Sequence, residues 1–209
     1  MPMITVHDAM QKVIARWEGG FQDMAADPGN WVNGNLVGTM RGVTPAVLAS
    51  YRGVPVGSIT KQTMLSVTLD EAASIAVAKF YNGTGLDRLP WGPATDVIVD
   101  FGWGAGPGQA CRTIQRHIGV APDGIIGPAS RAAYSAWVNK CGSWEGAVRS
   151  FHTAREGFYD LICARNPSLM AFRAGWANRS RWFMPESAEW WPHWLADMPP
   201  MPVGGQVVK

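Results

Sequence analysis

The sequence of 209 residues contains few cysteines and few recognisable metal-binding patterns. Its three cysteines, Cys111, Cys141 and Cys163, form no Cys-x-x-Cys pair, and its four histidines occur in no His-Glu-x-x-His motif. Both of these missing motifs are local spacings typical of zinc sites. There is also no Gly-rich phosphate loop followed by a lysine. We therefore expect no metal ion and no organic cofactor, and we interpret the cysteines as buried thiols.

Long apolar runs are also missing. No stretch of about 18 uninterrupted apolar residues occurs, which argues against a membrane span and against stable membrane insertion. The N-terminal segment carries Asp8, Lys12 and Arg16 in a helical pattern, whereas a standard signal peptide has a basic start followed by an apolar block. With 47% hydrophobic and only 16% charged residues, the chain is predicted to be globular.

Charge of both signs is present, but it is distributed unevenly. Residues 1–110 hold 7 Lys or Arg and 9 Asp or Glu, whereas residues 111–181 hold 10 and 4, a net charge of +6. The basic segment predicts an anionic partner, and charge alone leaves nucleic acid, an acidic glycan and a lipid surface open. The chain also contains eleven tryptophans. Aromatic faces serve as core filler or as platforms for sugars and bases.

Helical periodicity, caps and turn formers predict a mostly α (α+β) fold. Thr68 and Glu71 have the spacing of a capping box. Residues 22–43, rich in Asn, Gly and Pro, predict a loop or small hairpin. A Gly-rich step is expected at 102–108, and 199–209 lack periodicity and predict a flexible tail. The expected helices cover residues 6–18, 45–52, 72–81, 97–101, 111–117, 130–141, 144–165 and 167–181.

Glu18 is the first candidate for chemistry. It falls at the end of the first expected helix, where the helix dipole disfavours an ionised carboxylate. The bulky neighbours Trp17 and Phe21 add a desolvation penalty in the same direction. A carboxyl group held in its protonated form suits a general acid. An exposed glutamate at a helix end before a glycine is also common, so the local pattern leaves a structural role open.

Asp27 and Thr39 follow on the turn-rich segment. An acid at a helix end, with a second carboxylate and a hydroxyl on a facing loop, is the arrangement that glycoside hydrolysis needs. One group protonates the leaving oxygen, and the others hold a water or stabilise positive charge at the anomeric carbon. Asp27 also stands in Asp-Pro-Gly, an ordinary turn sequence in which the carboxylate binds its own backbone.

Three runs in the first half together resemble glycoside hydrolase family 108, the phage-type N-acetylmuramidases. They are Glu18-Gly19-Gly20-Phe21, Asp27-Pro28-Gly29-Asn30-Trp31 and Gly38-Thr39-Met40-Arg41-Gly42-Val43-Thr44. The order Glu, Asp, Thr is also similar to the triad of T4-type phage lysozymes. The resemblance implies a lysozyme-like helical domain in which Glu18 is the proton donor and Asp27 and Thr39 are its catalytic partners. We also predict substrate contacts for Trp31 and for Arg41, which stands where the family tends to have tyrosine.

The second half resembles the peptidoglycan-binding segment that follows this catalytic part. The runs are 100–108, 114–119, 123–128, 158–159, 166–169 and 172–179. Trp103 and Asp123 become further candidates for substrate contacts, and Gly102-Trp103 departs from the family, which tends to have a small residue and Asn there. The resemblance implies a catalytic part at 1–90 and a helical peptidoglycan-binding-like part at 91–182, followed by a Trp- and Pro-rich extension at 183–209.

Taken together, the residues and the resemblance predict an endolysin-type muramidase. It would hydrolyse the β-1,4 bond between N-acetylmuramic acid and N-acetylglucosamine, with peptidoglycan glycan strands rather than nucleic acid as its partner. We expect synthesis in the bacterial host cytoplasm and action on the cell wall after release. Two alternatives stay open: a lytic transglycosylase, which uses one glutamate and leaves anhydro-sugars, and a non-catalytic cell-wall-binding module.

The last feature is a stretch with four tryptophans, residues 182–195. Interfacial membrane helices carry Lys and Arg on their polar face, whereas this stretch has Glu186 and Glu189 and no basic residue. Prolines at 185 and 192 interrupt any long helix. We therefore predict that the stretch folds back and packs its tryptophans on the catalytic part or across the junction of the two halves, with only the segment from about Pro199 mobile.

Overall fold

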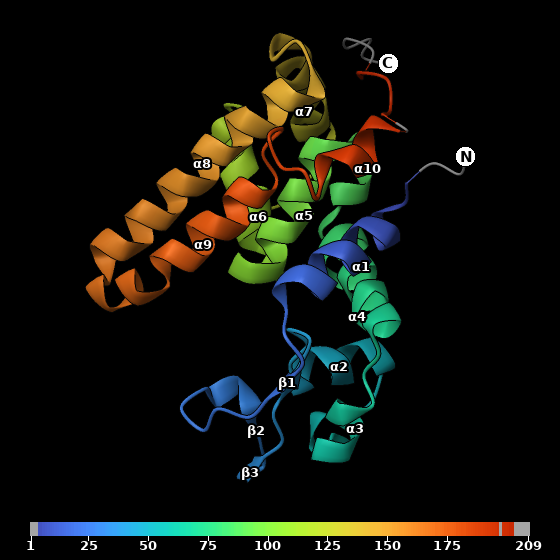
Figure 1. Cartoon of the computed structure of the whole chain (residues 1–209), viewed down its shortest axis with the longest axis vertical. Coiled ribbons are helices and arrows are strands. Elements are labelled where there is room, and N and C mark those ends of the chain that lie inside the picture. Colours follow the sequence, from blue (N-terminus) through green and yellow to red (C-terminus); the bar gives the residue numbers. More distant parts are fainter. Residues whose placement is uncertain (1–3, 197, 203–209) are drawn as a thin grey trace. The chain divides into compact units, whose positions relative to one another are not determined.

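The computed structural model describes residues 4–196 and 198–202, and it divides into two compact units. The N-terminal unit is Thr5–Lys79, and the C-terminal unit runs from Phe80 onward and includes Ile4. Both units are built mainly from helices (Figure 1). The short strands all fall between Phe21 and Met40, so the prediction of a mostly α fold with a small β element in the first third is confirmed.

The N-terminal unit contains two pairs of short antiparallel strands. Strand β1 pairs with β4, and β2 pairs with β3. The hairpin expected at 22–43 is therefore present. The strands are β1 (Phe21–Gln22), β2 (Trp31–Val32), β3 (Asn35–Leu36) and β4 (Thr39–Met40). The helices of this unit are α1 (Val6–Trp17), α2 (Pro45–Arg52), α3 (Lys61–Leu65) and α4 (Leu69–Ile75), which continues in a π-helical turn, Ala76–Tyr81.

Helix α1 leads directly to the candidate acid. A capping box starts it: the Thr5 hydroxyl accepts the Asp8 N–H at 3.2 Å, and the Asp8 carboxylate accepts the Thr5 N–H at 3.0 Å. Its apolar face, Met10, Val13 and Ile14, is fully buried, and α1 packs against α4. Burial of this face fixes the helix end from which Glu18 projects.

Two expectations for the N-terminal unit need correction. The Thr68 hydroxyl does accept the Glu71 N–H at 3.0 Å, but both Glu71 carboxylate oxygens bind Arg52 at 2.8 Å. The expected capping box is therefore only half formed, because a cross-helix ion pair takes the carboxylate. Helix α3 was not predicted. It begins with a side-chain cap from Thr60 and has five residues, too few for an apolar period to show.

The C-terminal unit is a set of packed helices around α5, in which α5 contacts α6 and α8, and α8 lies beside α9 (Figure 1). Residues 93–103 of α5 are all buried, so this helix forms the centre of the unit. Its helices are α5 (Pro93–Ala105), α6 (Pro107–His117), α7 (Pro128–Lys140), α8 (Trp144–Arg165), α9 (Met170–Trp182) and α10 (Trp191–Leu195). Short 3₁₀ turns cover Asn82–Thr84, Leu86–Arg88 and Pro167–Leu169.

The prediction of a non-helical Gly-rich step over residues 102–108 is wrong in its extent. Helix α5 continues through Gly102 and Gly104, and the break comes at Gly106, whose φ is 92°. A Cβ on Gly102 would lie 3.2 Å from the Ala110 Cβ of α6. Glycine at position 102 therefore allows α5 and α6 to pack closely. Burial of α5 outweighs the low helix propensity of glycine.

A buried ion cluster ties α5 to α8 and α9. The Asp100 carboxylate is fully buried and accepts hydrogen bonds from Arg155 at 2.7 Å and from Arg179 at 2.7 Å. Arg155 is 1% exposed and also donates to the Tyr159 hydroxyl at 2.8 Å. Burial alone would raise the pKa of Asp100, but the charges of Arg179 and Arg155 outweigh burial and hold that pKa below its ordinary value.

Substitution of Asp100 by Asn is expected to destabilise the C-terminal unit by about 3–5 kcal/mol, because it leaves the buried Arg155 charge without its counter-ion. The lowered pKa also gives a pH dependence. The native state favours the ionised carboxylate, so its stabilisation is present above the unfolded-state value of about 4 and is lost as pH falls below it. Chemical denaturation between about pH 3 and 7 measures both effects.

The matched control is Asp160→Asn, which removes an exposed carboxylate that pairs with Arg173 at 2.8 Å. An exposed pair of this kind contributes about 0–1 kcal/mol. Equal losses for the Asp100 and Asp160 variants would contradict a special role for the buried cluster.

The tryptophans of the Trp-rich stretch are buried, as predicted, but the contacts of Trp191 and Trp194 lie within the C-terminal unit, whereas the prediction placed the tryptophans on the catalytic part or across the junction of the two halves. Trp190, Trp191 and Trp194 are at most 2% exposed. The Trp194 ring lies 5.6 Å from Trp91, and the Trp191 indole donates to the Phe183 carbonyl at 2.9 Å. The tryptophans are thus core side chains of this unit.

The prediction of a flexible tail from Pro199 places the start of the tail too early. The Pro199 carbonyl accepts the Trp144 indole N–H at 2.8 Å, and residues 198–199 are half-buried. Most of the expected tail, residues 203–209, lies outside the described residues.

Cys111 and Cys163 are buried thiols as predicted, whereas Cys141 is only half-buried. Among the described residues, no helix combines the length and apolar character needed to cross a membrane.

Candidate active site

Glu18 occupies the C-cap of α1. Its backbone N–H donates to the Ile14 carbonyl at 3.0 Å, and its own φ of −97° and ψ of 100° turn the chain out of the helix. Glu18 as a whole is half-buried. The two glycines that follow, Gly19 and Gly20, are exposed, and a Cβ on either would meet nothing within 4 Å. The candidate acid is therefore followed by two exposed residues that have no side chain.

The chain then enters β1, whose partner strand carries Thr39. In the antiparallel register, Gln22 lies opposite Thr39, and Phe21 lies opposite Met40. Residues directly opposite each other in such a pair project to the same face. The short strand pair thus brings Thr39 to the chain segment that follows Glu18.

A fully buried amide, Asn30, joins these side chains. The Thr39 hydroxyl donates to Asn30 Oδ1 at 2.6 Å. Gln22 and Asn30 exchange amide hydrogen bonds at 3.2 and 2.9 Å, and the Asn30 amide also donates to the Met24 carbonyl at 3.0 Å. Because Thr39 is only 6% exposed, its hydroxyl holds this network in place from within. We call Gln22, Asp27, Asn30 and Thr39 the amide network.

Asp27 lies at the edge of the amide network. It caps the 3₁₀ turn Pro28–Asn30, where its Oδ1 accepts the Gly29 N–H at 2.9 Å. Its Oδ2 lies 3.5 Å from the Gln22 amide nitrogen. The turn-forming role expected for Asp-Pro-Gly is confirmed, and the second oxygen of the same half-buried carboxylate faces the network.

Sequence reasoning missed Gln22 and Asn30 as members of this site. Asn30 was seen only as part of a turn-rich run, and the pattern gave no sign that its side chain is buried. Gln22 would have needed the strand register to be known, since only pairing with Thr39 places it beside the candidate catalytic residues.

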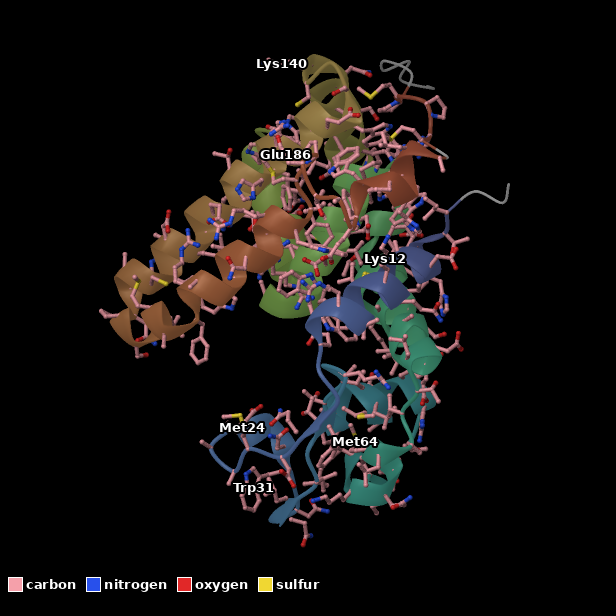
Figure 2. The ribbon with its side chains drawn as sticks, in the orientation of Figure 1. Lys12, Met24, Trp31, Met64, Lys140 and Glu186 are labelled. Carbon is pink, nitrogen blue, oxygen red and sulfur yellow. The ribbon has the colours of Figure 1, made fainter. Side chains whose placement is uncertain are left out.

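Arg41 and Trp31 flank the network in the same unit. Arg41 has a φ of 52°, in the left-handed region, and its N–H donates to the Gly20 carbonyl at 3.3 Å. Within the described residues, its buried Nε atom has no hydrogen-bond partner. Strained backbone of this kind is typical of functional sites. Trp31 is 42% exposed, is fixed by a 3.0 Å indole bond to the Ala25 carbonyl, and lies near Met24 (Figure 2).

Trp103 and Asp123 belong to the other unit. Trp103 is 9% exposed and packs against Phe80 with ring centroids 4.8 Å apart. Asp123 is exposed, and its Oδ1 accepts the Ile125 N–H at 2.8 Å and the Gln115 amide at 2.7 Å. These bonds, the Ile125 one foremost, lower the pKa of Asp123. In the described chain, no group of three or more His, Cys, Asp or Glu side chains is placed to hold a metal ion.

Comparison with known proteins agrees with this architecture. Residues 11–106 match the family model described as Glycosyl hydrolase 108, and residues 109–181 match the model described as Predicted Peptidoglycan domain. The solved structure described as that of Brucella abortus SagA shares the fold, with a TM-score of 0.60 and 24% identity over 88% of this chain and 97% of that chain. No curated protein matches the chain.

The two family matches define the class: the chain is a peptidoglycan-degrading glycoside hydrolase. Residues 11–106, which hold Glu18 and the whole amide network, are the part that matches the glycosyl hydrolase 108 model. A peptidoglycan segment follows at 109–181.

Proposed function

We propose that the protein is a muramidase that hydrolyses the β-1,4 bond between N-acetylmuramic acid and N-acetylglucosamine, in the manner of a phage endolysin that lyses the host wall. The observation that carries the proposal is the amide network, which starts four residues after Glu18 and includes both Asp27 and Thr39. In this assignment Glu18 protonates the leaving glycosidic oxygen.

Asp27 would hold the water or stabilise the oxocarbenium-like charge, through the oxygen that faces Gln22. Thr39 would act as a positioning residue, because its buried hydroxyl fixes Asn30 and, through it, Gln22. A transglycosylase needs no second carboxylate, so a built network around Asp27 favours hydrolysis over that alternative.

Trp31 and Arg41 are proposed as sugar contacts near the catalytic groups. The exposed Trp31 face suits a pyranose ring, and the half-buried Arg41 guanidinium suits a polar or anionic substituent. Sugar contacts by Trp103 and Asp123 remain predictions. We assign catalysis to residues 1–90, glycan binding to 91–182 and a supporting role to 183–209, with synthesis in the host cytoplasm and action on the wall after release.

Mass spectrometry of digested, purified peptidoglycan tests the bond and the reaction together. A muramidase leaves N-acetylmuramic acid at the new reducing end. Anhydro-sugar ends would establish the transglycosylase, N-acetylglucosamine reducing ends would show that the other glycosidic bond is cut, and intact strands would leave only a binding module.

Asp27→Asn is expected to lower the rate of hydrolysis by about 10- to 100-fold, the size of effect expected when a reacting group loses its positioning. The loss should be smaller than for Glu18→Gln, because several groups share the positioning of water. The matched control is Asp23→Asn, on the same loop, which breaks only an exposed ion pair with Lys61. A silent Asp27 variant together with anhydro products would contradict hydrolysis.

Thr39→Ala is expected to cost stability as well as rate. It removes the 2.6 Å donor to the buried Asn30 Oδ1, to which the Gln22 amide still donates at 3.2 Å, so the expected loss is that of one hydrogen bond, about 0.5–1.5 kcal/mol. Thr39→Ser keeps the hydroxyl and should restore most of both. Thermal unfolding and the rate of reducing-end release provide the two measurements, and an Ala variant that is fully stable and active would remove Thr39 from the site.

A further inference from the structure

Three stacked aromatic rings form a column that runs from the core of the C-terminal unit to its surface. The Tyr159 and Trp176 rings lie 5.1 Å apart at 24°, and the Trp176 and Phe172 rings lie 5.9 Å apart at 28°. Exposure rises along the column: Tyr159 is 6% exposed, Trp176 is half-buried and Phe172 is 58% exposed. We call these three residues the aromatic column.

The inner end of the aromatic column is rigidly held. The Tyr159 hydroxyl accepts the Arg155 Nε–H at 2.8 Å, and Arg155 is bound to the buried Asp100. Arg173 lies 5.7 Å from the Tyr159 ring and donates to Glu156 at 2.7 Å and to Asp160 at 2.9 Å. The column is built on the hairpin of α8 and α9, which lie side by side (Figure 1).

The outermost ring has an unused face. Within the described chain, the one aromatic contact of Phe172 is with Trp176 on its inner side. Met170, two residues earlier on α9, is similarly exposed at 59%. An exposed aromatic side chain on a supporting stack offers a flat apolar face to a ligand.

The surroundings favour a neutral ring as the occupant. Sites for single-stranded nucleic acid combine stacking with free cations that follow the phosphates, and anionic membranes attract free cations as well. Beside the column, however, the Arg173 charge is neutralised by Glu156 and Asp160. The net charge of +6 over residues 111–181 attracts the anionic wall at long range, while the column itself offers a flat apolar face to a pyranose ring.

We propose that the outer face of Phe172 is a stacking platform for a sugar ring of the peptidoglycan glycan, supported by Trp176 and Tyr159. The proposal rests on peptidoglycan as the substrate, and all three rings lie in the segment that matches the peptidoglycan family model. It assigns glycan contact to the α8–α9 hairpin, which contains neither of the sequence candidates Trp103 and Asp123.

The test measures binding without cleavage. In full-length Glu18→Gln protein, binding to purified sacculi is measured by co-sedimentation, and binding to a soluble N-acetylglucosamine tetrasaccharide by calorimetry. Adding Phe172→Ala or Phe172→Leu is expected to weaken both by about 5- to 100-fold, as for loss of one ring-stacking contact. Phe172→Trp should retain binding. Met170→Ala, which removes an equally exposed apolar side chain outside the column, is the matched control.

Unchanged binding by both the Ala and Leu variants would overturn the proposal, and so would an equal loss for Met170→Ala. The Leu variant keeps an apolar side chain, and melting temperatures confirm that each variant is folded. A Phe172-dependent loss seen only with an oligothymidylate, or only with phosphatidylglycerol vesicles, would overturn it in favour of nucleic acid or membrane. If sacculi bind in a Phe172-dependent way but wild-type protein releases no sugar ends, the column stands and the muramidase proposal fails.

Discussion

Glu18→Gln is expected to abolish hydrolysis of purified peptidoglycan, with a loss of at least the 10²- to 10⁴-fold that general acid catalysis typically supplies. The substitution keeps the shape of the side chain and removes its transferable proton. The cap of α1 is made by the backbone N–H of Glu18, so the melting temperature should change little. Turbidity loss of cell walls and release of reducing ends measure the rate, and thermal unfolding measures the fold.

Glu71→Gln is the matched control in the same unit, because it makes the same chemical change at a carboxylate that binds Arg52. It should stay close to wild-type activity. Near-normal lysis by the Glu18 variant would remove this residue from catalysis, and loss of activity in both variants would point to a general effect of charge.

Truncation before Trp182 is expected to unfold the C-terminal unit. It removes five buried aromatic side chains, namely Trp182, Phe183, Trp190, Trp191 and Trp194. Loss of each buried Phe or Trp costs about 3–5 kcal/mol, and a domain has only about 5–15 kcal/mol in total. The near-ultraviolet circular dichroism of the packed tryptophans and the cooperative thermal transition should both disappear.

The control truncation ends the chain after Pro202 and keeps every one of these aromatic side chains, together with the Pro199 carbonyl that binds Trp144. It should unfold like the full chain. A truncation before Trp182 that keeps its melting temperature but loses binding to anionic liposomes would instead establish a membrane role for the Trp-rich stretch.

Local patterns were enough to predict most helices and the burial of the Trp-rich stretch. The first helix has a side-chain cap, an apolar stripe and a glycine stop, all within one short segment. The extent of α5 could not be predicted in the same way, because Gly102 lies inside a helix only since α6 packs closely against it. Tertiary contact there outweighs local propensity.

The site was predictable where its residues are neighbours in sequence. Glu18 follows from its place at a helix end, and Asp27 follows from its turn. The hydrogen bond between Thr39 and Asn30 depends on a strand register and on burial of an amide, and neither leaves a periodic signal in so short a β element. Family resemblance supplied Thr39, but only the packing shows that its hydroxyl points inward.

The two glycines after Glu18 have a consequence of a different kind. Neither is among the residues with positive φ, and neither would bring a Cβ within 4 Å of a neighbour. Alanine at either position is therefore compatible with the backbone and with the packing of the described chain. Folding alone imposes no need for glycine here. If only glycine is accepted at these positions, the constraint comes from outside the polypeptide, namely from a bulky glycan strand that must pass close to Glu18.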